Sequence, residues 1–221
     1  MNRATAAARA LISILLLAAP AFATWQDIPS KDFTVAAPPA PGSPESDRDY
    51  ATILKLQDER KPEQCAAAEA QSIPDFQSLF GTSGILSKAE ADAVGPFVQS
   101  ASRFLSRISG YYKKRFLRPR PYSVDARVRP CIEKPTGAKA YPSTHAASGV
   151  FDACVLGRLF PERAGIFASH GRYAGELRVL TGVHHPSDVA AGQALGALVC
   201  ERLLREDDFR AELARVKASL P

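Results

Sequence analysis

Helix signals follow one another along most of this chain of 221 residues, and they constrain its fold more than any other feature. Ser87-Lys-Ala-Glu90 is a capping box, Ser143 precedes a further apolar run as an N-cap, and Pro186 suits the first turn of a last long helix. Period-two alternation is scarce, and no Asn-Gly hairpin or solenoid repeat is present. The pattern predicts an all-α fold, a single-domain helical bundle.

The chain divides into a leading arm and a helical body. Residues 24–48, rich in Pro, Ala and Ser, are predicted to form a polyproline-like arm outside the core. The body spans 49–221. Within it we expect helices over 49 to about 62, 87 to about 107 with a continuation over 111–117, 144 to about 160, 163–181, and 186 to about 204, the last either running on or restarting near 207.

The first 23 residues have the pattern of a secretory signal peptide. Arg3 and Arg9 form a basic region, residues 10–19 form a short apolar run, and Ala21-Phe22-Ala23 supplies a small-x-small cleavage pattern. That run is too short to span a bilayer comfortably, and no later apolar stretch reaches spanning length. We therefore expect cleavage after Ala23, a periplasmic or secreted product, and no stable insertion into a membrane.

Charge and cysteine content limit the classes of ligand. Lys and Arg number 28 against 23 Asp and Glu, a net charge of +5, which fits an anionic ligand without requiring a nucleic acid as a binding partner. The four cysteines of an exported chain suggest two disulfides, with three possible connectivities. No CxxC or HxxxH spacing is present, so we expect no metal site.

The first candidate motif is the basic run from Lys113 to Arg120-Pro121, which holds five cations in eight residues. Lys113 and Arg120 are seven residues apart, two helical turns, so we expect their side chains to converge. Two converging cations suit a phosphate, because Arg offers a bidentate fork and Lys a point charge. Taken alone, the run fits a solvated basic face or a nucleic-acid patch better.

The second motif is Pro142-Ser143-Thr144-His145, placed where a helix is expected to begin. Free backbone N–H groups and the positive end of the helix dipole make such a start an anion site, and the Ser143 hydroxyl adds a donor. His145 would lie beside whatever those groups bind. A simple cap and a core-facing imidazole remain the alternatives.

The third motif places His184 four residues before Asp188, with Arg178 upstream. A carboxylate that accepts from one imidazole nitrogen fixes the tautomer and leaves the other nitrogen as a nucleophile. Arg178 supplies one more cation. His170 and His185 have no such partner in the sequence, and we expect both to be structural.

In this order and spacing the three motifs resemble the signature of the type 2 phosphatidic acid phosphatase (PAP2) superfamily. That signature is Lys-x6-Arg-Pro, Pro-Ser-Gly-His and Ser-Arg-x5-His-x3-Asp. Here it reads Lys113…Arg120-Pro121, Pro142-Ser143-Thr144-His145 and Leu177-Arg178…His184…Asp188. The exported helical context looks most like the bacterial class A non-specific acid phosphatases, over about Tyr50 to Leu204. The resemblance implies the bundle of the PAP2 and vanadium-haloperoxidase type, without a cofactor or metal.

The resemblance also implies an acid phosphatase that hydrolyses small phosphate monoesters through a phosphohistidine. His184 would be the nucleophile, Asp188 would orient it, and His145 would protonate the leaving group and then activate water. Inorganic phosphate or vanadate would be a ligand or inhibitor, and a homo-oligomer is left open. The groups that would hold the phosphate oxygens are Lys113, Arg120, Ser143, Thr144 through its backbone N–H, and Arg178.

Two positions depart from the family pattern. Thr144 stands where the family usually has Gly, and Leu177 stands where Ser precedes the Arg. We expect Thr144 to sit in an ordinary helical first turn, where a β-branched residue is tolerated. Both departures bear on rate and substrate more than on reaction type.

Other functions compete with this reading. A lipid phosphate or pyrophosphate phosphatase is less favoured because membrane-spanning segments are missing, and a vanadate-dependent haloperoxidase is less favoured because the chain is small. A non-catalytic anion-binding protein could use the run from Lys113 to Arg120. Such a protein would need neither His145 nor the pair of His184 and Asp188, so these residues separate the two classes.

Among the three disulfide connectivities we predict one. Cys154 and Cys200 both fall on helices that follow the catalytic motifs, so we pair them with each other. Cys65 then pairs with Cys131.

Overall fold

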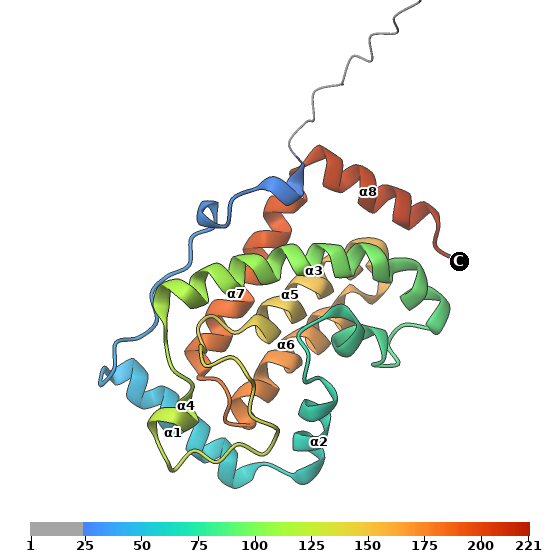
Figure 1. Ribbon diagram of the computed structural model, residues 1–221. Coiled ribbons are helices and arrows are strands. Elements are labelled where there is room, and N and C mark those ends of the chain that lie inside the picture. Colours follow the sequence, from blue (N-terminus) through green and yellow to red (C-terminus); the bar gives the residue numbers. More distant parts are fainter. Residues whose placement is uncertain (1–23) are drawn as a thin grey trace, which may run out of the picture.

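The computed structural model describes residues 24–221, so the predicted signal peptide lies outside the described residues. Helices make up most of this part (Figure 1), and its one β pairing is an isolated bridge between Pro119 and Lys139. The all-α prediction is confirmed. The α-helices are α1 (Pro44–Glu59), α2 (Pro62–Ala70), α3 (Lys88–Phe116), α4 (Pro121–Val124), α5 (Thr144–Leu159), α6 (Ala164–Leu180), α7 (Pro186–Leu203) and α8 (Asp207–Ala218).

Shorter helical turns link these elements. The 3₁₀ turns are η1 (Trp25–Asp27), η2 (Ser30–Asp32) and η4 (Pro161–Arg163), and a π turn forms η3 (Gln77–Gly81). Across residues 24–221, no helix combines the length and apolar character that crossing a bilayer requires.

The helix starts agree with the capping residues of the sequence. The Ser87 hydroxyl accepts from the Glu90 amide at 3.2 Å and opens α3, and Ser143 caps α5. The two segments expected over 87–117 form the one continuous helix α3, and the last helix does restart, with α8 beginning at Asp207. Helix α2 was not predicted; it is a short alanine-rich helix with Pro62 at its first position.

Close backbone contacts place α5 at the centre of the bundle, against α6 and α7, with α3 across them (Figure 1). A Cβ on Gly149 would lie 2.2 Å from the Gly171 carbonyl oxygen, and one on Gly192 would lie 2.3 Å from the Ser143 carbonyl oxygen. Only glycine allows these approaches. They set the N-termini of α5 and α7 side by side, where two of the three motifs lie.

The prediction that residues 24–48 lie outside the core is wrong for the first part of the arm. Trp25 and Phe33 are only 3% and 2% exposed and belong to the main hydrophobic cluster. The Trp25 ring packs edge to face on Phe104 and on Phe209 of α8, with centroids 5.5 and 5.4 Å away. Aromatic rings bury a large apolar area, and that gain outweighs the irregular backbone around them.

Both predicted disulfides are confirmed. Cys154 and Cys200 join α5 to α7, with Cα atoms 6.5 Å apart. Cys65 and Cys131 join α2 to the loop that follows α4, with Cα atoms 5.8 Å apart. The second bond therefore ties α2 to the loop that forms one wall of the site described below.

One buried carboxyl group lies in the core, away from the three motifs. Asp152 of α5 is fully buried and accepts a hydrogen bond from Ser102 of α3, while its Oδ2 has no partner within residues 24–221. Burial raises the pKa of Asp152 to about 8, although the bond from Ser102 opposes the shift. The folded state therefore keeps a proton that the unfolded chain releases near pH 4, and stability falls as the pH rises from about 4 to 8.

Replacing Asp152 by Asn removes the titrating group and keeps an acceptor oxygen for Ser102. We expect Asp152→Asn to unfold at a higher temperature than the unchanged protein at about pH 8, and to match it within about 1 kcal/mol at pH 4. Thermal unfolding at the two pH values measures this. If Asp152→Asn and the unchanged protein were equally stable at pH 4 and also at pH 8, Asp152 would not hold its proton in the folded state.

Candidate active site

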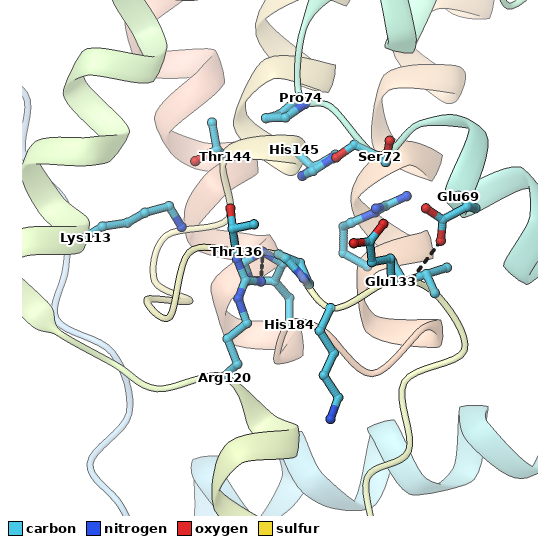
Figure 2. A pocket seen from close by; sticks show the side chains of 14 residues that line it. Glu69, Ser72, Pro74, Lys113, Arg120, Glu133, Thr136, Thr144, His145 and His184 are labelled. Atoms are coloured by element: carbon cyan, nitrogen blue, oxygen red, sulfur yellow. Dashed lines mark hydrogen bonds between the residues drawn. The ribbon is translucent and has the colours of Figure 1, made fainter.

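A cavity of about 330 Å³ opens where α3, α5 and α6 bring the three motifs together (Figure 2). Six predicted site residues line it: Lys113, Arg120, Thr144, His145, Arg178 and His184. Ser143 and Asp188 are fully buried and lie behind this lining. The rest of the wall comes from Glu69, Ser72 and Pro74 on one side and from residues 132–136 on another.

His184 lies in the turn between α6 and α7 with both ring nitrogens engaged. Its Nδ1 is 3.3 Å from Asp188 Oδ2, and its Nε2 is 3.1 Å from Nη1 of Arg120. A guanidinium can only donate, so Nε2 accepts and Nδ1 carries the ring proton, which it donates to Asp188. In this tautomer Nε2 carries the lone pair of the ring, and in the unliganded site Arg120 donates to it.

The surroundings keep His184 neutral. Burial lowers the pKa of His184 to about 3, Arg120 and Lys113 act in the same direction, and the hydrogen bond to Asp188 opposes them. Burial alone would raise the pKa of Asp188, but hydrogen bonds from His184 and His185 hold it well below its usual value. The pair is therefore a neutral imidazole beside an ionised carboxylate.

His185 is not the unpartnered residue that we expected. Its Nδ1 lies 3.0 Å from Asp188 Oδ2, closer than that of His184, and its backbone N–H donates to the same oxygen at 2.8 Å. Asp188 sits three residues further on, in the first turn of α7, so the carboxylate reaches back to both histidines. His170 contacts the Leu79 carbonyl at 2.7 Å, away from the cavity.

His145 is held from the opposite wall by backbone carbonyls. Its Nε2 lies 2.9 Å from the Gln71 oxygen and 3.1 Å from the Ser72 oxygen. Carbonyls only accept, so Nε2–H donates and Nδ1 carries the lone pair. Burial lowers the pKa of His145 well below its ordinary value, and Arg178 and His184 add to the effect. His145 is therefore neutral in the unliganded site.

Three cations face the cavity and donate to backbone carbonyls. Lys113 Nζ donates to the Pro142 oxygen at 2.6 Å, Arg120 Nε donates to the Gly137 oxygen at 2.7 Å, and Arg178 donates to the Ala68 oxygen. Within residues 24–221 none of these cations forms an ion pair with a carboxylate. The cavity therefore holds positive charge that suits an oxyanion.

Burial changes the acidity of these cations. It lowers the pKa of Lys113 to about 7, with Arg120 adding to the effect, and it lowers the pKa of Arg178 to about 10. Arg178 is 1% exposed, and its Nε is a buried donor without a partner within residues 24–221. Such a donor is costly to leave unsatisfied, and a bound anion would satisfy it.

Lys113 and Arg120 converge, but not across two helical turns as predicted. Helix α3 ends at Phe116, Leu117 adopts a left-handed conformation with φ 52°, and Arg120 is the N-cap of α4. Pro119 has no N–H and disfavours a helical conformation in the residue before it, so the helix cannot continue. The turn brings Arg120 back toward the cavity.

Thr144 and Leu177, the two residues that depart from the family signature, both lie in helices that line or support the cavity. Thr144 is the first residue of α5, as predicted, and its hydroxyl lies 2.8 Å from that of Ser109 while its side chain lines the cavity. Leu177 is buried in α6. Ser143 Oγ accepts from the Ala146 amide at 3.4 Å as the N-cap. The N–H groups of the next residues have no partner inside the helix.

Within residues 24–221, no group of three or more His, Cys, Asp or Glu side chains is gathered around one point. Four cations and two carboxylates line the cavity, and this excess of positive charge suits a phosphate. The cations are Lys113, Arg120, Lys134 and Arg178, and the carboxylates are Glu69 and Glu133.

A comparison with protein-family models identifies the family that the part of the chain around the cavity resembles. The model of the PAP2 superfamily matches residues 97–205, a range that contains all three motifs. Over this range, just under half of the chain, the sequence is similar to the PAP2 superfamily. The predicted resemblance is therefore confirmed, and Asp49 and the other residues of α1 lie outside the matched range.

Similar curated proteins are bacterial acid phosphatases. The chain is 37% identical over 124 residues to a non-specific acid phosphatase of Salmonella typhimurium, covering 52% of this chain and 50% of the relative. It is 26% identical over 197 residues to an acid phosphatase of Zymomonas mobilis, covering 84% and 74%. It is 29% identical over 109 residues to a non-specific acid phosphatase of Providencia stuartii, covering 48% and 44%. The chain thus spans about half the length of most of these relatives.

The protonation state of His184 can be measured directly. We expect its Nδ1 to stay protonated and its Nε2 unprotonated from pH 7 down to about 4, because the pKa is lowered to about 3. Nitrogen-15 NMR of the ring nitrogens over this range reports both. A protonation midpoint near 6.5, the ordinary value for histidine, would contradict the geometry.

Proposed function

We propose that the chain is an exported, metal-independent acid phosphatase that hydrolyses phosphate monoesters through a phosphohistidine. One observation carries the proposal: three cations that form no ion pair with a carboxylate within residues 24–221 line the cavity with a neutral imidazole that is backed by a carboxylate. The PAP2 match and the similarity to bacterial acid phosphatases support it. Export is inferred from the sequence of residues 1–23 alone.

In the first half-reaction, His184 Nε2 attacks phosphorus and a P–N bond forms while the ester P–O bond breaks. The leaving oxygen takes a proton from His145 Nδ1, the nitrogen not held by the Gln71 and Ser72 carbonyls. Asp188 supports the positive charge that develops on the His184 ring. The alcohol departs, and the phosphoryl group stays on His184.

In the second half-reaction, water attacks phosphorus and gives a proton to His145 Nδ1. The P–N bond breaks, inorganic phosphate leaves, and His184 regains its lone pair. His145 then passes this proton to the departing phosphate or to solvent, and it is neutral again in the unliganded site. Splitting hydrolysis into two displacements lets one histidine act as nucleophile and the other as acid and base in turn.

The cations stabilise the charge that spreads over the three equatorial phosphate oxygens. The cations Lys113, Arg120 and Arg178 reach the cavity from three different elements, and Arg178 can offer its Nε, which has no partner among the described residues. The start of α5 adds backbone N–H groups beside the Ser143 hydroxyl and Thr144. The three cations line the cavity before substrate arrives, so the main rearrangement is that Arg120 moves its hydrogen bond from His184 Nε2 to a phosphate oxygen, which frees the lone pair for attack.

The same electrostatics favour work at acidic pH. A nucleophile with a pKa of about 3 stays unprotonated in acid, where ordinary histidine would be blocked. His145 must carry a proton to act as an acid, and its lowered pKa means that acid pH or the proton of a phosphate monoanion supplies it. Activity should therefore fall as the pH rises.

Turnover of p-nitrophenyl phosphate in EDTA tests the proposal. We expect hydrolysis without added metal, and His184→Ala should reduce it by about 10⁴-fold or more because the nucleophile is gone. His170→Ala is the matched control, since His170 lies away from the cavity, and it should keep its activity. Phosphate or vanadate binding without turnover at acidic and neutral pH would favour an anion-binding protein.

The role of His145 is tested with two leaving groups. We expect His145→Ala to slow alkyl phosphates by about 10² to 10⁴-fold and aryl phosphates far less, because only a poor leaving group needs a proton on the departing oxygen. The ratio of kcat/KM for an alkyl and an aryl phosphate, in both proteins, measures this. An equal loss for both substrates would count against His145 as the acid.

A further inference from the structure

A second arginine of the basic run lies behind the proposed nucleophile. Arg118 is 9% exposed and lies in the turn between α3 and α4. Its Nη1 donates to Asp188 Oδ1 at 2.7 Å, and its Nη2 donates to Asp49 Oδ2 at 2.9 Å. Asp49 and Asp188 are themselves 5% and 0% exposed. One guanidinium thus joins two buried carboxylates from α1 and α7.

The carboxylate that Arg118 holds has two imidazoles competing for its other oxygen. Asp188 Oδ2 lies 3.3 Å from His184 Nδ1 and 3.0 Å from His185 Nδ1. A rotation of the carboxylate toward His185 would release His184 and its tautomer. The charge-assisted bond to Oδ1 opposes this rotation, because it fixes the plane of the carboxylate from the far side.

Helix α1 anchors the guanidinium in turn. Asp49 accepts from the Ser187 amide at 3.0 Å and from the Ser187 hydroxyl, and Arg118 Nη1 donates to that hydroxyl at 2.6 Å. Ser187 directly precedes Asp188. Asp49 therefore binds both Arg118 and the first turn of α7, and it holds Arg118 beside that turn.

We propose that Arg118, anchored by Asp49, is a positioning residue for His184, which it acts on through Asp188. The proposal rests on the proposed function, since it concerns the nucleophile of that reaction. Arg118 does not line the cavity, whereas Arg120, two residues later, does. The two Arg-Pro pairs of the sequence thus have different tasks: the first orients the carboxylate, and the second contacts the imidazole.

The charged groups around His184 determine how each substitution changes the ease with which its ring is protonated. Arg120 and Lys113 face the ring from the turn before α4 and from α3, Asp188 faces it from α7, and His145 and Arg178 lie across the cavity on α5 and α6. Removing the positive charge of Arg118 leaves Asp188 less compensated, which makes His184 easier to protonate. Neutralising Asp49 removes a negative charge and has no such effect.

The test is the pH dependence of kcat/KM for p-nitrophenyl phosphate, whose acid limb reports the free enzyme's nucleophile. We expect Arg118→Gln to move this acid limb to higher pH by about one unit or more. The same variant should lower kcat on the pH plateau by about tenfold or more. Arg118→Lys, which keeps the charge but not the fork, should restore the limb and only part of kcat. Asp49→Asn should lower kcat without moving the limb upward.

Arg163→Gln is the matched control, because it breaks a partly buried ion pair with Glu90 far from the site. It should lower thermal stability and leave the limb in place. If Arg118→Gln does not fold, the double variant Arg118→Gln with Asp49→Asn leaves no unpaired carboxylate at position 49. It should show a smaller shift of the limb to higher pH, because Arg118 contacts Asp188 directly and Asp49 contacts it only through Arg118 and Ser187.

Two outcomes would overturn the positioning role. One is an unchanged acid limb in a folded Arg118→Gln protein, and the other is an equal upward shift in Asp49→Asn. Absence of turnover in the unchanged protein would instead overturn the proposed function, so the two failures are distinguishable.

Discussion

Asp188 is fully buried and accepts hydrogen bonds from side chains of three residues, His184, His185 and Arg118. Its backbone oxygen also accepts from the Ser143 amide at 2.9 Å, which fixes the start of α5 beside the start of α7. One residue thus sets the orientation of an imidazole and the position of a helix N-terminus. An ionised carboxylate can be kept in the interior only when it is satisfied in this way.

The fold followed from local signals wherever those signals are strong. The caps at Ser87, Ser143 and Pro186 predicted three helix starts, because each residue type satisfies or tolerates the free N–H groups of a first turn. The burial of Trp25 had no such signal, since it depends on Phe209 more than 180 residues away. Helix α2 was missed because short alanine-rich segments carry no amphipathic pattern.

The site residues that belong to the three spaced motifs could be predicted from the sequence. Six of the proposed residues line one cavity, although Lys113 and Arg120 converge through a turn and not along a helix. The partners of His145 and Arg178 are backbone carbonyls on and after α2, and a carbonyl has no side-chain signature in a sequence. Arg118 looked like one more cation of a basic run, because its partner Asp49 lies 69 residues earlier.

A crystal structure with vanadate bound would test the central claim most directly, since vanadate mimics the phosphoryl group in transfer. We predict vanadium bonded to His184 Nε2, with its oxygens on Arg120, Lys113, the Nε of Arg178 and the first amides of α5, and with His145 Nδ1 opposite His184. Vanadate bonded to another histidine, or held outside this cavity by exposed lysines and arginines, would contradict it.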